Sequence, residues 1–157
     1  MNKDIKQQYT LRITQANSSQ MVVIIYDILL DYLKEARTLL ESQSYGDYSE
    51  AIRRCTACIR ELIGSINQDS SLAGNLLSLY IYCNKELSKS ELHKSSSELD
   101  HVEMVISKLR DAFNEVALKD NALPIMGNTP EVYAGLTYGK ESLVVHLNQD
   151  SNRGYKV

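Results

Sequence analysis

The chain has 157 residues, of which 43% are hydrophobic and 24% charged, and its formal net charge is −3. This composition is typical of a single soluble domain, and the charge lacks the basic excess expected of proteins that bind nucleic acid or anionic membranes. No apolar run approaches the 18 or more residues of a membrane span, the amino terminus lacks a signal-peptide pattern, and the odd count of three cysteines fits a reducing compartment, so we predict a cytoplasmic protein.

Residues 1–16 are mostly polar and contain a few apolar positions. Ile5, Tyr9 and Ile13 are spaced by four, which places them on one face of a helix. A helix this short is not stable alone, so the segment must dock on the rest of the chain or remain mobile.

Residues 17–40 are predicted to form one long helix. Asn17 and Gln20 have the spacing of a capping box, and no Gly or Pro interrupts the segment. The β-branched run at 22–25 also suits a buried strand, but helical spacing continues for about four more turns, which favours a helix. Residues 21–26 are apolar on every side, so a single neighbouring helix cannot cover them.

Three further helices follow. Asp47 and Glu50 predict the start of a helix that runs to about residue 66. A third helix spans about 72–88 and again carries apolar residues around its axis, and a polar loop is predicted at 88–97. Ser95 and Glu98 suggest a capping box before a fourth helix, whose apolar residues keep a period of 3.6 to about residue 118.

The composition changes after residue 119. Both prolines and Gly127, Gly135, Gly139 and Gly154, four of the seven glycines, lie beyond this point. We therefore predict an all-α fold, with an antiparallel four-helix bundle at 17–118, a short helical segment at 1–16, and an irregular or disordered tail at 119–157.

Catalytic and metal-binding patterns are weak. Cys55 and Cys58 form a CxxC pair, but with Cys83 they supply only three of the four ligands that zinc needs, and they are predicted to be small core residues. Glu98 and His101 form a single Glu-x-x-His, which di-iron bundles use twice. His93 is weakly similar to a phosphotransfer histidine of a helical bundle, but it lies in a predicted polar loop, where a phosphoryl acceptor would have no supporting helix face. No enzymatic activity, metal or cofactor is predicted.

The most informative feature is the surplus of apolar residues on the first and third long helices. Either both helices lie centrally and the bundle covers them, or their surplus forms a hydrophobic groove for another chain's helix or extended peptide.

Several segments resemble the FliS family of flagellin-specific export chaperones. Tyr9 and Ile13 precede MVVIIYD at 21–27, and IRRCTACIREL at 52–62, NLLSLYIYCNKEL at 75–87 and VISKLRDAFNEV at 105–116 follow in the family's order and spacing. The chain departs from the family pattern at Asn17-Ser18, where Ser-Pro is usual, at Ile28, where Gly is frequent, and at Phe113, where tryptophan is common.

The resemblance implies a cytoplasmic chaperone that binds the disordered carboxy-terminal segment of flagellin, prevents premature polymerisation and helps deliver the subunit to the type III export gate. The amino-terminal segment, with Tyr9 and Ile13, would cover part of the binding surface. The expected groove residues are Val22, Ile25, Tyr26, Leu29, Leu76, Leu79, Tyr80 and Cys83. The alternative is a self-associating scaffold or adaptor whose apolar faces form a homodimer interface. Neither alternative involves nucleic acid or membrane insertion.

Overall fold

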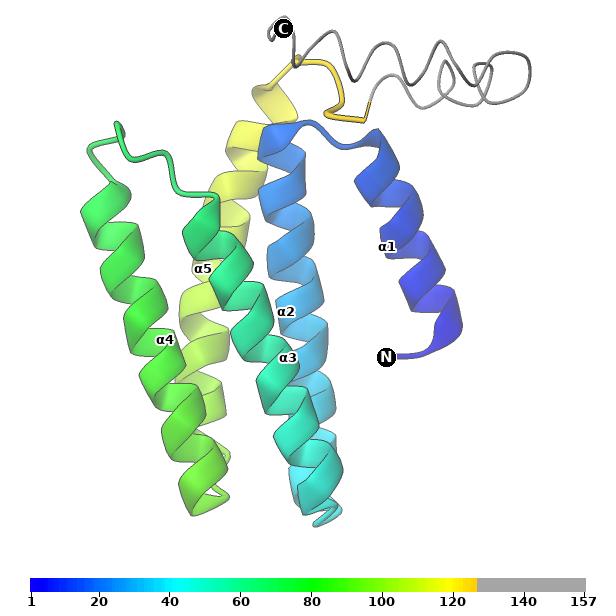
Figure 1. The fold of residues 1–157 in the computed structure, drawn as a ribbon, viewed down its shortest axis with the longest axis vertical. Helices are drawn as coiled ribbons and strands as arrows, with labels where there is room; N and C mark the ends of the chain where they lie inside the picture. The colour runs from blue at the N-terminus through cyan, green and yellow to red at the C-terminus, as the bar shows by residue number, and fades with distance from the viewer. Residues whose placement is uncertain (127–157) are drawn as a thin grey trace, which may run out of the picture.

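The computed structural model describes residues 1–126, and within this part the chain forms five helices and no strand (Figure 1). The helices are α1 (Lys3–Gln15), α2 (Ser18–Glu41), α3 (Tyr45–Gly64), α4 (Ala73–His93) and α5 (Ser97–Lys119). The predicted all-α fold is confirmed.

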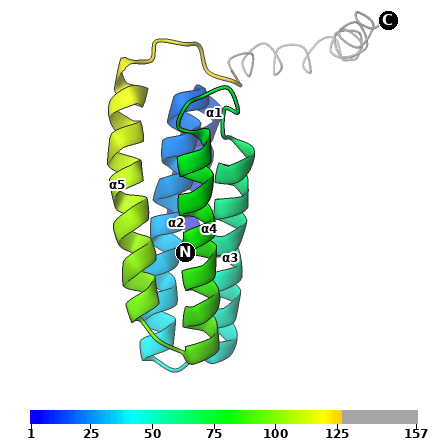
Figure 2. The same cartoon turned by 90° about the vertical axis from the view of Figure 1, so that its left-hand side faces the viewer.

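Helices α2 to α5 form an antiparallel four-helix bundle, as short connections between long amphipathic helices favour. Helix α2 packs against α3 and α5, and α4 also packs against α3 and α5. Helices α2 and α4 therefore face each other diagonally across the core (Figure 2).

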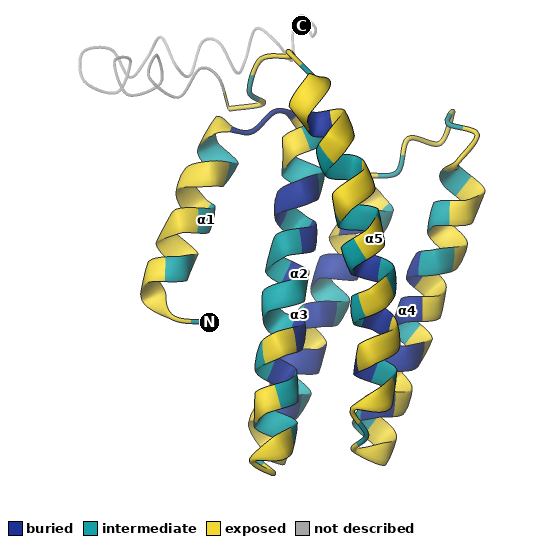
Figure 3. Ribbon diagram, turned by 180° about the vertical axis from the view of Figure 1, so that it is seen from behind, coloured by how far each residue is buried: buried dark blue, intermediate teal, exposed yellow. Residues whose placement is uncertain are grey.

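The core consists of buried residues from all four bundle helices, whose positions are the dark blue parts of the ribbon in Figure 3. Cys55, Cys58 and Cys83 are buried free thiols, so the prediction that they are small core residues is confirmed. Burial raises the pKa of Cys58 to about 11 and of Cys83 to about 12, which disfavours the reactive thiolate. The large side chains with no measurable exposure include Tyr26, Leu29, Leu33, Tyr48, Ile59, Leu62, Leu87, Leu99 and Ile106.

Helix α2 begins with the predicted capping box, in which Asn17 accepts a hydrogen bond from the Gln20 backbone and the Gln20 side chain accepts one from Asn17. Its apolar first half is largely enclosed, because α2 contacts α1, α3 and α5. Val23 and Ile24 are buried, and Val22 and Ile25 are partly buried against the core. The surplus apolar surface expected on this helix is therefore mostly used in packing.

Two predicted helix starts are wrong. Helix α3 begins at Tyr45 after Ser44, so Asp47 lies in its first turn; the earlier start lets the Tyr48 amide bond to the Ser44 carbonyl while its ring enters the core. Helix α5 begins at Ser97, and the Ser95 hydroxyl contacts Ser97 rather than closing a box with the Glu98 amide.

The predicted loop at 88–97 is wrong over residues 88–93, which continue helix α4. Leu87 and Ser90 are fully buried, and the Ser90 hydroxyl bonds to Tyr48 and to the Ser95 carbonyl. A polar residue thus extends the buried stripe, which a hydrophobic pattern does not reveal. The helix ends at His93, and Lys94 after it has a left-handed φ of 53°.

Helix α1 lies outside the bundle and packs chiefly against α2, and residues 120–126 run beside the junction of α1 and α2 (Figure 1). Most of the predicted tail, residues 127–157, lies outside the described residues. In the part of the chain that the structure describes, no helix combines the length and apolar character needed to cross a membrane.

Candidate functional site

An apolar cavity of about 180 Å3 opens at the end of the bundle where residues 65–72 connect α3 to α4. Val22 of α2, Leu76 of α4 and Phe113 of α5 contribute walls, and Ile66 and Leu72 of the connection close one side. A site of this size and character suits a single large apolar side chain better than a cofactor.

A pair of buried tyrosines supports the cavity from within. The hydroxyls of Tyr26 and Tyr80 lie 2.5 Å apart and join α2 to α4 across the core. Burial and this contact raise the pKa of Tyr26, so both hydroxyls stay neutral at physiological pH. The Tyr26 ring also packs on Phe113 at 5.7 Å between centroids. Because Tyr80 lines the cavity, its wall is fixed by the core.

The structure separates the predicted groove residues into two groups. Tyr26, Leu29, Tyr80 and Cys83 are buried in the core, whereas the remaining four are partly buried: Val22, Ile25, Leu76 and Leu79. Three of the eight, Val22, Leu76 and Tyr80, line the same cavity.

The sequence did not predict several residues that line this cavity. Ile66 and Leu72 were not predicted because they belong to a connection, and Phe113 was not predicted because it continues the regular apolar stripe of its helix. Nearby on α4, Leu77 is 40% and Ile81 49% exposed. Their spacing of four aligns them on one helix face, and this spacing is the signal that identifies them in the sequence. The surplus apolar surface predicted for the third long helix is thus present on α4.

Helix α1 carries the two predicted cover residues, Tyr9 and Ile13, and both are partly buried. The Tyr9 hydroxyl donates to Asp31 at 2.6 Å, and Arg12 pairs with Asp27 at 2.8 Å. Asp27 also accepts from Arg110 of α5 at 2.7 Å. Burial and the bond to Asp31 raise the pKa of Tyr9, which keeps this donor protonated.

The acidic partners of α1 define where the helix lies. Asp27 and Asp31 are four residues apart, and Glu35, which accepts from the amino group of Met1 at 2.7 Å, follows after four more. Helix α1 therefore runs along one face of α2. None of its residues lines the cavity at the α3–α4 connection.

A second hollow, of about 500 Å3, lies between the end of α1, the start of α2, the end of α5 and residues 120–121. Val23, Ile24 and Ala117 form its apolar part, and Gln15, Gln20 and Asn114 are among its polar residues. The α1 helix borders this hollow, so its position affects access to it.

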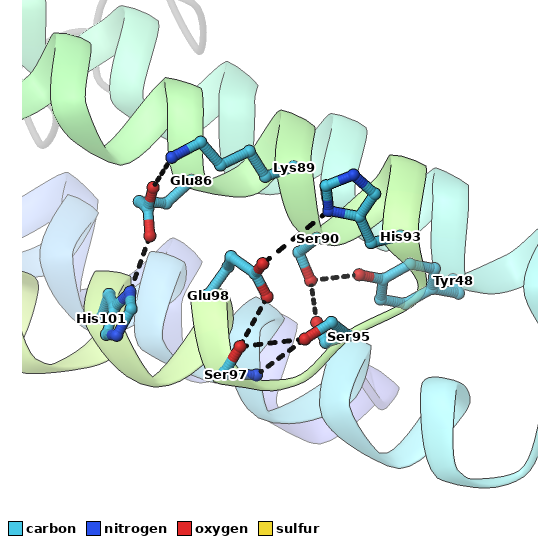
Figure 4. A network of polar contacts seen from close by, with 9 residues as sticks. All are labelled: Tyr48, Glu86, Lys89, Ser90, His93, Ser95, Ser97, Glu98 and His101. Carbon is cyan, nitrogen blue, oxygen red and sulfur yellow. Dashed lines mark hydrogen bonds and ion pairs between the residues drawn. The ribbon is translucent and has the colours of Figure 1, made fainter.

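A polar network joins α4 to α5 at the opposite end of the bundle (Figure 4). The buried Glu86 carboxylate contacts His101 Nδ1 at 2.6 Å and Lys89 Nζ at 2.9 Å, and these bonds lower its pKa. Hydrogen bonds from Ser95 and Ser97 lower the pKa of Glu98 to about 2. These contacts join α4 to α5 beside the turn between them.

Within residues 1–126, no group of three or more His, Cys, Asp or Glu side chains is arranged to hold a metal ion. Glu98 and His101, the predicted half of a di-iron motif, have separate partners: Glu98 bonds to Ser97, and His101 to Glu86.

Comparison with known protein families gives a match over most of the chain. The model of the family described as "Flagellar protein FliS" matches residues 1–120, which include all five helices. The search of curated proteins gives no match.

Proposed function

The chain belongs to the FliS family of flagellar chaperones, and we propose that its client is the disordered carboxy-terminal segment of flagellin. By holding this segment in the cytoplasm, the protein prevents flagellin from polymerising prematurely and helps to deliver the flagellin subunit to the type III export gate. It acts by binding and carries out no catalysis. The observation that supports this proposal most directly is the cavity at the α3–α4 connection, on which Val22, Leu76 and Tyr80 converge.

An unfolded client loses conformational entropy when it binds, so the site must bury a large apolar area. Burial yields about 25 cal/mol per Å2, and an apolar anchor in the cavity, continued over Leu77 and Ile81 of α4, supplies such area. Tyr26, Leu29 and Cys83 contribute by shaping the core beneath the surface, since they have no exposed area of their own in this state.

Helix α1 is proposed to compete with the client on α2. Tyr9 and Ile13 lie on α1, which covers the Asp27–Asp31 face of α2 and borders the larger hollow. Helix α1 would therefore block the client from the Asp27–Asp31 face of α2 rather than from the cavity at the α3–α4 connection. Removal of α1 is expected to raise client affinity, because the bound state no longer competes with an internal ligand.

Calorimetric titration with the carboxy-terminal segment of flagellin from the same cell tests the client. Submicromolar binding with a strongly negative heat-capacity change is expected, because apolar area is buried as the client orders. Leu76→Glu should weaken binding at least tenfold, whereas Ser78→Glu, on an exposed position of the same helix, should not. Circular dichroism verifies that both variants remain helical.

Absence of binding by the folded wild-type protein would contradict the client assignment. Equal binding by the wild type and Leu76→Glu would retain the client and exclude the cavity as its contact.

The alternative of self-association also has a specific observation in its favour, since Leu77 and Ile81 form an exposed apolar pair on α4. Two copies joined through this face would form a symmetric dimer. Light scattering with and without the flagellin segment distinguishes the two functions, because a client site on this face predicts that the segment dissociates any dimer.

A further inference from the structure

We propose that residues 120–126, here called the strap, lock the hinge between α1 and α2 and thereby control whether α1 stays on the bundle. The chain leaves α5 at Lys119 and turns across the junction of α1 and α2 (Figure 1). The family match ends at residue 120, so nearly all of the strap lies beyond the matched region.

The hinge is short and enclosed. Only Ala16 and Asn17 separate α1 from α2, and their exposed fractions are 2% and 1%. The Ala16 amide bonds to the Ile13 carbonyl, and the Asn17 amide bonds to the Gln20 side chain. A swing of α1 away from α2 requires new backbone angles at these two residues, because the helices on either side are rigid.

The strap satisfies the remaining polar groups of the hinge. The Ile125 amide donates to the Ala16 carbonyl at 2.9 Å. The Asn17 carboxamide nitrogen donates to the carbonyls of Asp120 at 3.3 Å and Ala122 at 3.2 Å. One end of the strap is anchored on α2, where the Ser19 hydroxyl donates to the Asp120 carboxylate at 2.5 Å.

These bonds make the positions of the strap and of α1 interdependent. Asn17 and Ser19 hold the strap on α2, so rotation of α1 at the hinge would separate the buried Ala16 carbonyl from the Ile125 amide, which is costly for groups removed from water. Helix α1 has no buried residue of its own, so the strap adds a restraint that α1 packing does not supply. Asp120 and Asn121 also line the larger hollow, and release of the strap opens that hollow together with α1.

Hydrogen exchange of the full-length protein tests the lock. Ile125→Pro removes the amide that bonds to Ala16, while the matched variant Ile125→Ala keeps it and changes the same exposed side chain. Asp120→Ala removes the anchor on Ser19. A released helix of this length unfolds in water, so amide exchange in α1 reports its release.

We expect exchange in α1 to be at least tenfold faster in Ile125→Pro combined with Asp120→Ala, and unchanged in Ile125→Ala. Exchange in α3 and α4 should be the same in every variant, which shows that the bundle is intact. Equal α1 exchange in the combined variant and the wild type would overturn the lock.

The consequence for client binding rests on the proposed function. If α1 competes with the flagellin segment, the combined variant should bind this segment several-fold more tightly than the wild type. Faster α1 exchange with unchanged affinity would overturn the role of the strap in client binding. A wild type that does not bind the segment would instead refute the proposed client, while the exchange result still decides whether the strap is a lock.

Discussion

The interior of the bundle and the interface between α1 and α2 are held together by different forces. Leu29 and Leu33 of α2 are completely buried among apolar neighbours, whereas α1 has no buried residue and reaches α2 through Tyr9–Asp31 and Arg12–Asp27. Both sets of contacts involve α2, but those in the core are made by apolar side chains and those with α1 by polar side chains. We therefore predict that α1 can detach from α2 while the bundle stays folded.

Typical energies support this distinction. Full burial of a leucine side chain stabilises a fold by about 1.5–3 kcal/mol, whereas a solvent-exposed ion pair contributes about 0.2–1 kcal/mol. Because α1 is held by a few polar contacts and contributes no buried residue, we expect its attachment to be weaker than that of the bundle helices. A mobile cover requires such an attachment, and a structural core does not.

The largest effect is expected from Leu33→Ala, which removes a fully buried side chain. The void left by the substitution and the lost apolar contacts should lower the free energy of unfolding by about 3 kcal/mol, as measured by urea denaturation. Leu11→Ala in α1, where the side chain is 59% exposed, serves as the control and should change stability by less than about 0.5 kcal/mol. Similar losses in both variants would show that α1 belongs to the same packed unit.

Glu86→Gln tests how much a buried polar contact inside the bundle contributes to stability. The loss in the free energy of unfolding should be smaller than that caused by Leu33→Ala. Bonds from His101 and Lys89 lower the pKa of Glu86 below its ordinary value of 4.5. Its stabilising effect is therefore present above about pH 4.5 and is lost as the pH falls through the lowered value.

Urea midpoints at neutral and acidic pH measure this dependence. The wild type should be more stable than Glu86→Gln near pH 7, and the difference should vanish in acid. Glu115→Gln, at an exposed position of α5, should show no such dependence. A difference that persists in acid would exclude the charge of Glu86 as its cause.

The sequence predicts the bundle better than it predicts its surfaces. Helical period, the Asn17–Gln20 capping box and short connections define four helices, because each depends on neighbours along the chain. The extension of α4 to His93 depends on Ser90 bonding to Tyr48 of another helix, which no local pattern reveals.

The candidate site shows the same limit. Apolar residues around α2 and α4 look equivalent in the sequence, yet Ile24 of α2 is 3% exposed while Ile81 of α4 is 49% exposed. The difference arises because α2 contacts three helices and α4 contacts two, and this arrangement is set by tertiary packing. The role of Asp27, Asp31 and Glu35 as a docking face for α1 likewise appears only when α1 is placed.

Asp27→Asn is expected to loosen α1 by about 1 kcal/mol, since the carboxylate pairs with Arg12 of α1 and with Arg110 of α5. Exchange of α1 amides should accelerate by about fivefold, and the urea midpoint of the bundle should fall only slightly. Asp47→Asn, at an exposed position of α3, is the matched control. A large loss of bundle stability with unchanged α1 exchange would assign the main role of Asp27 to the α2–α5 contact.

The smallest effect is expected from salt. Between about 0.1 M and about 1 M ionic strength the Debye length falls from about 10 Å to about 3 Å, which screens the partly exposed Arg12–Asp27 pair. The Tyr9–Asp31 hydrogen bond has a neutral donor and is less sensitive, so α1 exchange should accelerate only about twofold. Exchange in the bundle core should not accelerate, because apolar packing does not depend on charge. If α1 exchange is also unchanged, the partly buried Ile5 and Ile13 hold the helix, and its attachment then differs from the bundle interior in extent rather than in kind.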